Sequence, residues 1–150
     1  MAATLVACLR SRLLALTGLL ALIGACGLFG PGVQSEYLLV SINGKPLPAP
    51  ATEGRDYQGH LAQQIFSWSQ LVLYENGTYK WSVTQQNLLD GVPEAGMPQG
   101  TSETSGHFSS HDSLFTVGWM FEATLHRDTL YARDVSGGFD WASFAFLRQP

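Results

Sequence analysis

The sequence predicts an all-β domain, an antiparallel up-and-down β-barrel of about eight strands, behind an N-terminal signal peptide. Short runs rich in β-branched and aromatic residues recur from residue 36 onward, and clusters of Gly, Asn, Asp and Pro separate them. Regular short strands joined by hairpin turns are typical of barrels and sandwiches. The signal is predicted by the first 25 residues, in which a charged part precedes an apolar part.

The apolar run near the N-terminus has the organisation of a secretory signal peptide. Arg10 and Arg12 precede it, Leu13–Ile23 is uncharged, and small residues lead into Cys26. The run is well short of the ~20 residues that a membrane-spanning helix needs. The tetrad Ile23–Cys26 resembles the lipobox of bacterial lipoproteins, with a plain cleaved signal or a short membrane anchor as the alternatives.

The lipobox implies that residues 1–25 are removed and that Cys26 becomes an acylated N-terminus. Each buried methylene contributes about 0.8 kcal/mol, so two or more acyl chains anchor a protein stably. Cys8 lies inside the signal, so no thiol remains for a disulfide, and the domain must fold on its core alone. Gly27 resembles the signal for outer-membrane delivery. We therefore expect a lipid-anchored protein of the bacterial cell envelope, on the periplasmic face of the outer membrane in a diderm host.

The composition of the mature part limits the classes of partner that it can bind. Once both signal arginines are removed, six Lys and Arg residues stand against twelve Asp and Glu, a net charge of −6. No basic stripe is present to neutralise phosphates, so nucleic acid is not a predicted partner. All 17 aromatic residues lie after residue 28, which predicts a folded core rather than disorder.

The first half of the mature part contains the clearest strand signals. Residues 26–35, rich in glycine, are predicted to form a flexible tether, and residues 36–150 the barrel domain. Glu36–Ile42 is a predicted strand closed by the turn signal Asn43-Gly44. Three prolines make Lys45–Gly59 an extended loop or edge segment. Phe66–Glu75 and Thr78–Thr84 then form a predicted hairpin, with Asn76-Gly77 as a type I′ turn.

The second half is predicted to be a long loop followed by short strands. Gln85–Gly100 is rich in Gly and Pro, and loops of this length are usually functional or disordered. The expected strands are Thr101–Phe108, Ser113–Val117, Trp119–His126, Thr129–Asp134 and Ala142–Arg148. Ser109–Asp112 is the first of the turn clusters between them.

Several of these stretches together resemble small lipocalin-like (calycin-type) lipoprotein domains of bacteria. The matching motifs are Asn43–Pro48, Asn76–Tyr79, Gly100–Phe108 and Phe146–Arg148, and the resemblance covers about Tyr37–Arg148. The Gly-x-Trp fingerprint of true lipocalins is absent from the first strand. The resemblance implies a barrel whose interior is either packed or holds one small ligand.

Aromatic residues at alternating positions are the candidate ligand site. They are predicted to point into the barrel, where they either fill the core or line a cavity: Tyr79, Trp81, Trp119, Phe121, Phe144 and Phe146. An eight-stranded barrel is wide enough for either arrangement. If a cavity exists, the segments Lys45–Gly59 and Gln85–Gly100 are expected to form its mouth.

The remaining polar motifs do not predict catalysis, a metal or a cofactor. His107 and His111, with Asp112 and Glu103, are either solvated turn residues, which we favour, or a weak divalent-metal site. Ser109–Asp112 places Ser, His and Asp side by side in sequence, which is not the geometry of a triad. We therefore expect no enzymatic activity.

Two functions follow from the sequence. The first is a non-enzymatic, lipid-anchored envelope protein that binds a small apolar molecule or lipid inside the barrel. The alternative is a structural or protein-interaction module of the envelope whose barrel is packed. A filled interior is the observation that favours the second.

Overall fold

A computed structural model describes residues 31–97, 99–139 and 142–150. The strands are β1 (Val33–Ile42), β2 (Lys45–Pro46), β3 (Ala49–Arg55), β4 (Leu61–Tyr74), β5 (Thr78–Leu89), β6 (Val92–Pro93), β7 (Gly100–His111), β8 (Leu114–Val117), β9 (Phe121–His126), β10 (Thr129–Asp134) and β11 (Ser143–Arg148). The described residues contain no helix, and therefore none that is long and apolar enough to cross a membrane.

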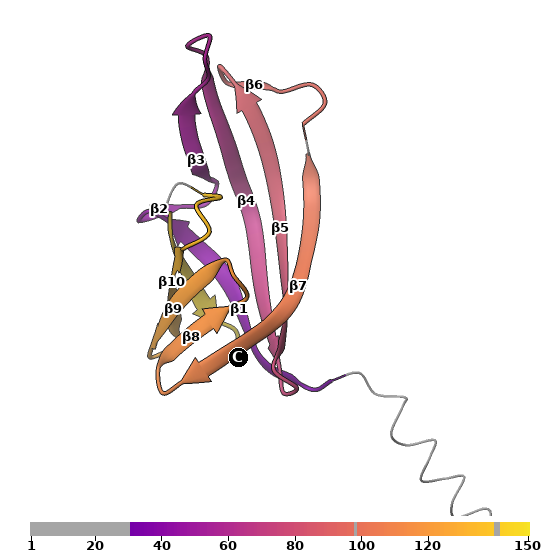
Figure 1. The fold of residues 1–150 in the computed structure, drawn as a ribbon, viewed down its shortest axis with the longest axis vertical. Helices are drawn as coiled ribbons and strands as arrows, with labels where there is room; N and C mark the ends of the chain where they lie inside the picture. Colours follow the sequence, from indigo (N-terminus) through magenta and orange to yellow (C-terminus); the bar gives the residue numbers. More distant parts are fainter. Residues whose placement is uncertain (1–30, 98, 140–141) are drawn as a thin grey trace, which may run out of the picture. The chain divides into compact units, whose positions relative to one another are not determined.

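Eight of the strands close into an antiparallel barrel (Figure 1). The order around the ring is β1, β4, β5, β7, β8, β9, β10 and β11. Strand β1 closes it, because its first half pairs with β4 and its second half pairs with β11. The predicted all-β, up-and-down barrel is confirmed.

Three barrel strands continue beyond the ring and form an open extension with two further strands, β3 and β6. β3 pairs with Leu61–Phe66 of β4, that segment pairs with the end of β5, and β6 pairs with β5. The upper part of β7 pairs with β5 alone. In Figure 1 these segments rise past the ends of β8–β10.

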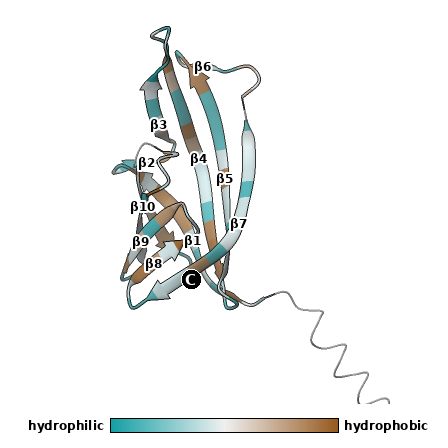
Figure 2. Cartoon of the chain, viewed as in Figure 1, coloured by the Kyte–Doolittle hydropathy of each residue, from teal (hydrophilic) through white to brown (hydrophobic). Residues whose placement is uncertain are grey.

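The barrel forms because its strands alternate between an apolar inner face and a polar outer face. Along β5, for example, Tyr79, Trp81 and Val83 are buried, and Lys80 faces outward. Figure 2 shows hydrophobic and hydrophilic stretches along β4 and β5. The inner residues of all eight strands form one continuous core.

Turn chemistry was predicted correctly at one Asn-Gly pair and incorrectly at the other. Asn43 and Gly44 have φ values of 50° and 76°, the positive pair that a type I′ turn requires. At the β4–β5 turn, Gly77 has positive φ but Asn76 does not. The Gly77 N–H donates to the Tyr74 carbonyl at 3.0 Å. This is the three-residue hairpin loop in which a final glycine adopts the left-handed conformation.

Several predicted boundaries are also wrong. β5 continues to Leu89, so much of the predicted loop Gln85–Gly100 is strand. β7 continues to His111, through most of the predicted turn at residues 109–112, and β1 begins at Val33, inside the predicted tether. The predicted signal peptide, the lipobox and Cys26 lie outside the described residues.

Candidate functional site

Five of the six predicted aromatic residues lie in the core. Trp81, Phe121, Phe144 and Phe146 are at most 4% exposed and form a chain of ring contacts. The Trp81 and Phe121 ring centroids are 5.1 Å apart at a near-perpendicular angle, and those of Phe121 and Phe144 are 5.3 Å apart. The Trp81 indole N–H donates to the buried Ser69 hydroxyl at 2.6 Å. These are the contacts of a well-packed aromatic core.

Tyr79, the fifth member, lies under the β8–β9 turn. It is 2% exposed, and burial raises the pKa of its hydroxyl. Its Oη atom lies against Gly118, where an added Cβ would be only 2.7 Å away. Gly118 also has a φ of 57°, which favours glycine. The turn can therefore approach Tyr79 only because residue 118 has no side chain.

The prediction that Trp119 points into the barrel is wrong. Trp119 lies in the β8–β9 turn and is 74% exposed, whereas Met120 is buried. Residues 118–120 form a turn, so the alternation that places Phe121 inward does not extend back to Trp119.

Two further aromatic residues complete the cluster, and the sequence did not identify them. Phe66 of β4 is fully buried, and Phe139 enters from the β10–β11 loop. The Phe139 ring contacts the Phe66, Trp81, Phe144 and Phe121 rings at centroid distances of 5.6, 5.7, 5.9 and 6.4 Å.

The buried carboxylate of Asp134 holds the loop that carries Phe139. Asp134 has no exposed surface. Its Oδ1 accepts hydrogen bonds from the Ser136 N–H and hydroxyl, and its Oδ2 accepts one from the Phe139 N–H at 2.9 Å. The Ala142 N–H donates to the Phe139 carbonyl. The loop is thus fastened by hydrogen bonds, and Phe139 fills space among the core rings.

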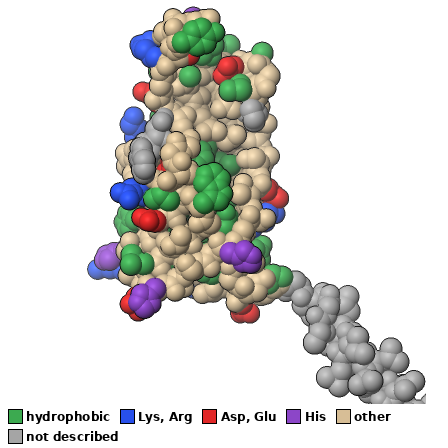
Figure 3. Space-filling view, in the orientation of Figure 1, with side chains coloured by type: hydrophobic (Ala, Val, Ile, Leu, Met, Phe, Trp, Pro, Cys, Tyr) green, Lys and Arg blue, Asp and Glu red, His purple; other side chains and the backbone are tan. Residues whose placement is uncertain are grey.

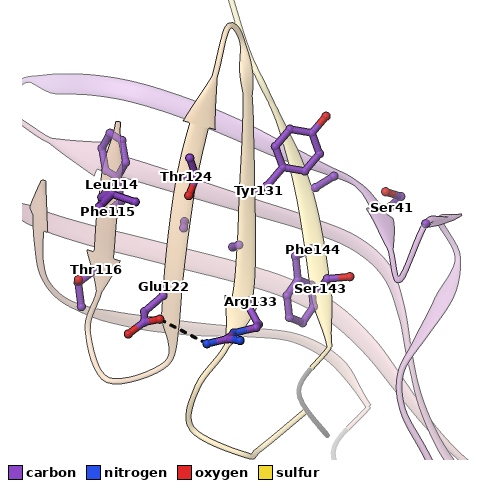
Figure 4. A pocket seen from close by; sticks show the side chains of 14 residues that line it. Ser41, Leu114, Phe115, Thr116, Glu122, Thr124, Tyr131, Arg133, Ser143 and Phe144 are labelled. Carbon is purple, nitrogen blue, oxygen red and sulfur yellow. Dashed lines mark ion pairs between the residues drawn. The ribbon is translucent and has the colours of Figure 1, made fainter. Parts of the chain in front are cut away.

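One hollow among the described residues lies outside the barrel. A half-open groove of about 740 Å³ runs over the outer faces of β8–β11 (Figure 4). Leu114 and Tyr131, both more than half exposed, contribute apolar surface. At one end Arg133 Nη2 lies 3.6 Å from Glu122 Oε2. The mixed lining suits contact with another molecule.

Polar pairs occur mainly on the outer surface. Lys80 Nζ lies 2.6 Å from Glu103 Oε1, and the mutual hydrogen bond raises the pKa of Lys80 and lowers the pKa of Glu103. At the tip of the extension, His60 Nδ1 lies 2.6 Å from Asp90 Oδ2. Asp90 Oδ1 accepts the Leu61 N–H at 2.8 Å. That backbone hydrogen bond and His60 lower the pKa of Asp90, and the bond to Asp90 raises the pKa of His60.

The histidines near the β7–β8 turn do not assemble a metal site in the described part of the chain. His111 Nε2 lies 3.7 Å from Asp112 Oδ2, with both side chains almost fully exposed. Glu103 is paired with Lys80, and His107 lies opposite Thr78 on β5. Among the described residues, no three His, Cys, Asp or Glu side chains gather as potential metal ligands.

The two segments that were expected to form a cavity mouth instead build the extension. Lys45–Gly59 supplies β3 of the extension, together with β2, which pairs with β1, and Gln85–Gly100 supplies the end of β5 and all of β6. Comparison with known proteins found no matching family model, no matching curated protein and no matching solved structure. The residues and their geometry therefore carry the functional argument.

Proposed function

We propose that this protein is a non-enzymatic, lipid-anchored domain of the bacterial cell envelope that acts through its surface, as a structural or protein-interaction module. The observation that carries the proposal is the packing of the barrel. The rings of Phe66, Trp81, Phe121, Phe139 and Phe144 contact one another in the core. A core filled in this way supports surface contacts as the mode of action.

The charge and shape of the surface support a protein partner rather than nucleic acid. Acidic residues outnumber basic ones in the mature part. On the face drawn in Figure 3, charged side chains are scattered over the domain without a continuous basic patch. The outer groove and the exposed extension are the features available for contact.

Exposed Val92, at the tip of the extension, is a suitable position for a photo-crosslinking amino acid in the full chain. Crosslinking in intact cells, with a second probe at Leu114 in the outer groove, is expected to trap a protein partner through at least one position. Failure to trap any protein at both positions contradicts the interaction function.

The lipid anchor is tested separately. Cys26→Ser is expected to release the protein from the membrane fraction and to abolish incorporation of labelled palmitate, because acylation requires the cysteine thiol. Cys8→Ser, within the same signal, is the matched control and should leave both properties unchanged. Persistence of the Cys26→Ser protein in the membrane fraction contradicts lipid anchoring.

Carriage of a small apolar molecule is the second candidate function, and Phe139 is the observation that favours it. This side chain comes from a loop, so a ligand that displaced its ring from the aromatic cluster would break no strand pairing. Native mass spectrometry of the full chain in mild detergent, with an organic extract, tests the candidate. A co-purifying apolar mass that is lost on denaturation would favour carriage, and a clean protein mass would favour the packed module.

A further inference from the structure

One edge of β7 is unpaired over half of the strand. Residues 100–107 pair with β5, whereas the pairing with β8 on the other side covers only residues 108–111. Among the described residues, no strand pairs with the second edge of Gly100–Gly106. The extension therefore has an open edge along this segment, beyond the point at which β8 ends with Val117 opposite Phe108.

The hydrogen bonds at the lower end of β7 show which backbone groups point to the open side. The His107 carbonyl accepts from the Gly118 N–H on the β8 side, and the Phe108 N–H donates to the Gly77 carbonyl on the β5 side. Backbone groups alternate between the two edges of a strand. The N–H and C=O groups of Thr101, Glu103 and Ser105 therefore point away from β5, toward the open side.

This edge lacks the features that usually prevent pairing with another strand. Such features include proline, bulges and unpaired charges. The opposite edge of the extension, β3, contains Pro50 and a register shift immediately after it. β7 pairs with β5 without a shift, and its one acidic residue in this segment, Glu103, is neutralised by Lys80 at 2.6 Å.

The inner side of the same segment is also uncovered. Ser102 and Thr104 lie opposite Val83 and Trp81, on the face that is buried along β5, yet both are exposed. At the lower end of the edge, the Gly118 N–H donates to the His107 carbonyl. The next residue, Trp119, is 74% exposed. An added strand would satisfy the backbone groups of the edge, and the exposed inner face leaves room for the side chains of that strand.

We infer that the open edge of β7 pairs antiparallel with the same edge of a second copy of this chain, forming a two-fold symmetric dimer. Alternating backbone donors and acceptors are complementary to an extended polypeptide. A two-fold interface additionally requires self-complementarity, and the segment Gly100–Gly106 (GTSETSG) consists of small residues around one neutralised acid. This inference holds with or without the lipid anchor.

The register follows from charge. Pairing centred on Thr104 places Thr104 opposite Thr104 of the partner subunit, Glu103 opposite Ser105 of the partner subunit, and Ser102 opposite Gly106 of the partner subunit. Cross-strand Thr pairs are favourable. Pairing centred on Glu103 would place two carboxylates directly opposite each other, each paired only with its own Lys80, and it would lose the Thr pair. The Thr104-centred register is therefore the one we assign.

Disulfide crosslinking of the full chain tests this register in intact cells. Directly opposed residues at a non-hydrogen-bonded antiparallel position have Cα atoms about 4.5 Å apart, within disulfide range. Thr104→Cys is expected to give a reducible band at twice the monomer mass. The parent chain sets the background from Cys8 and Cys26, and Thr116→Cys, exposed on β8, is the control for random collision.

A second pair of variants separates edge pairing from folding. Ser105→Pro removes an N–H that points to the open side, so it leaves the β5–β7 hydrogen bonds in place and is expected to abolish the Thr104→Cys dimer. Ser105→Ala keeps that N–H and should retain the dimer. Light scattering of the full chain in mild detergent should likewise report a dimer for Ser105→Ala and a monomer for Ser105→Pro.

Near-UV circular dichroism, which reports the packing of Trp81, checks that each variant is folded. Equal crosslinking of Thr104→Cys and Thr116→Cys overturns the dimer, as does a dimer that survives in folded Ser105→Pro. A Thr104→Cys product of any other mass means that a different protein occupies the edge, which also overturns the second-copy assignment.

Discussion

Asp134 shows how one buried charge positions a loop in this barrel. Its carboxylate is fully buried, and it accepts hydrogen bonds from two backbone N–H groups and one hydroxyl of the β10–β11 loop. Hydrogen bonds to charged groups are stronger than neutral ones, and burial without them would be costly. The carboxylate therefore fixes the place at which Phe139 enters the core.

Replacing this carboxylate tests its role. Asp134→Ala is expected to lower the free energy of unfolding by about 3 kcal/mol, because buried loop donors lose a charged acceptor. Urea denaturation followed by tryptophan fluorescence measures the change. Asp128→Ala, in an exposed turn, is the matched control and should change stability by less than about 0.5 kcal/mol. Equal effects of the two substitutions would contradict an organising role for Asp134.

The His60–Asp90 pair makes the tip of the extension dependent on pH. Because the pKa of His60 is raised, its contribution to the stability of the tip is present below the ordinary histidine pKa. That contribution is lost as the pH rises through the raised pKa. Because the pKa of Asp90 is lowered, its contribution to the stability of the tip is present above the ordinary aspartate pKa. That contribution is lost as the pH falls through the lowered pKa. Asp56 also raises the pKa of His60.

The pair is therefore expected to stabilise the tip most between about pH 4 and pH 6.5. Hydrogen exchange at the Leu61 amide, which Asp90 accepts, measures this local stability. His60→Gln should accelerate exchange at about pH 5 and have a smaller effect at about pH 8.5. His126→Gln, on the exposed face of β9, is the control. An effect of His60→Gln that does not change with pH would exclude the charged pair as its cause.

At the scale of elements, period-two alternation predicted most strands but failed where the pattern is interrupted. Phe66 was not identified as a core residue because a register shift follows it, at the bulge before Trp68. Phe139 was missed because it lies in a loop. Trp119 was misplaced because Gly118 begins a turn that breaks the alternation. Tyr79, Trp81, Phe121, Phe144 and Phe146 could be predicted because each lies within a regular strand.

The extension was not recognised for a related reason. Beyond Gln85 the inner face of β5 is no longer opposed by the far wall of the ring, so polar residues such as Asn87 are tolerated there. Without apolar residues at alternate positions, the segment resembles a loop. Backbone pairing with β4 nevertheless continues to Leu89.

The β8–β9 turn depends on two properties of Gly118, and a comparison with Gly77 separates them. Both glycines have positive φ, but only at Gly118 would an added Cβ meet Tyr79 Oη, at 2.7 Å. Gly77→Ala is expected to cost about 1 kcal/mol of stability, from backbone conformation alone. Gly118→Ala should cost more, about 2–3 kcal/mol, because overpacking is added.

Removing the Tyr79 hydroxyl should recover part of the additional stability that Gly118→Ala loses relative to Gly77→Ala. The loss caused by Gly118→Ala, measured by urea denaturation, is therefore expected to be smaller in a Tyr79→Phe background, whereas the loss caused by Gly77→Ala should be unchanged. If Gly118→Ala costs the same in both backgrounds, steric contact with the hydroxyl is not the reason for glycine at this position.

At the scale of the whole molecule, the number of barrel strands could be predicted but the closure of the ring could not. Closure depends on β1 pairing with β4 through one half and with β11 through the other. The second pairing joins residues more than 100 positions apart, such as Tyr37 and Arg148. Local patterns contain no information about which distant edges meet, whereas turn residues identify the sequential hairpins.

Closure predicts an all-or-none response to loss of the last strand. Deleting residues 143–150 removes β11 and leaves unpaired edges on β1 and β10. The truncated chain is expected to lose cooperative thermal unfolding, measured by circular dichroism, and to aggregate. Pro150 lies beyond the end of β11, so deleting this residue alone should preserve the cooperative transition. A cooperative transition in the longer truncation would show that closure is dispensable.

The double pairing of β1 also has a consequence for the order of events after synthesis. The first strand of the barrel must wait for its last strand, so the ring cannot close before β11 has been made. Contacts between such distant residues make folding slow, because a large loop has to be closed before they form. The ring of a chain with this topology therefore stays open until β11 has been made, and the hairpins that do not involve β11 can form before it closes.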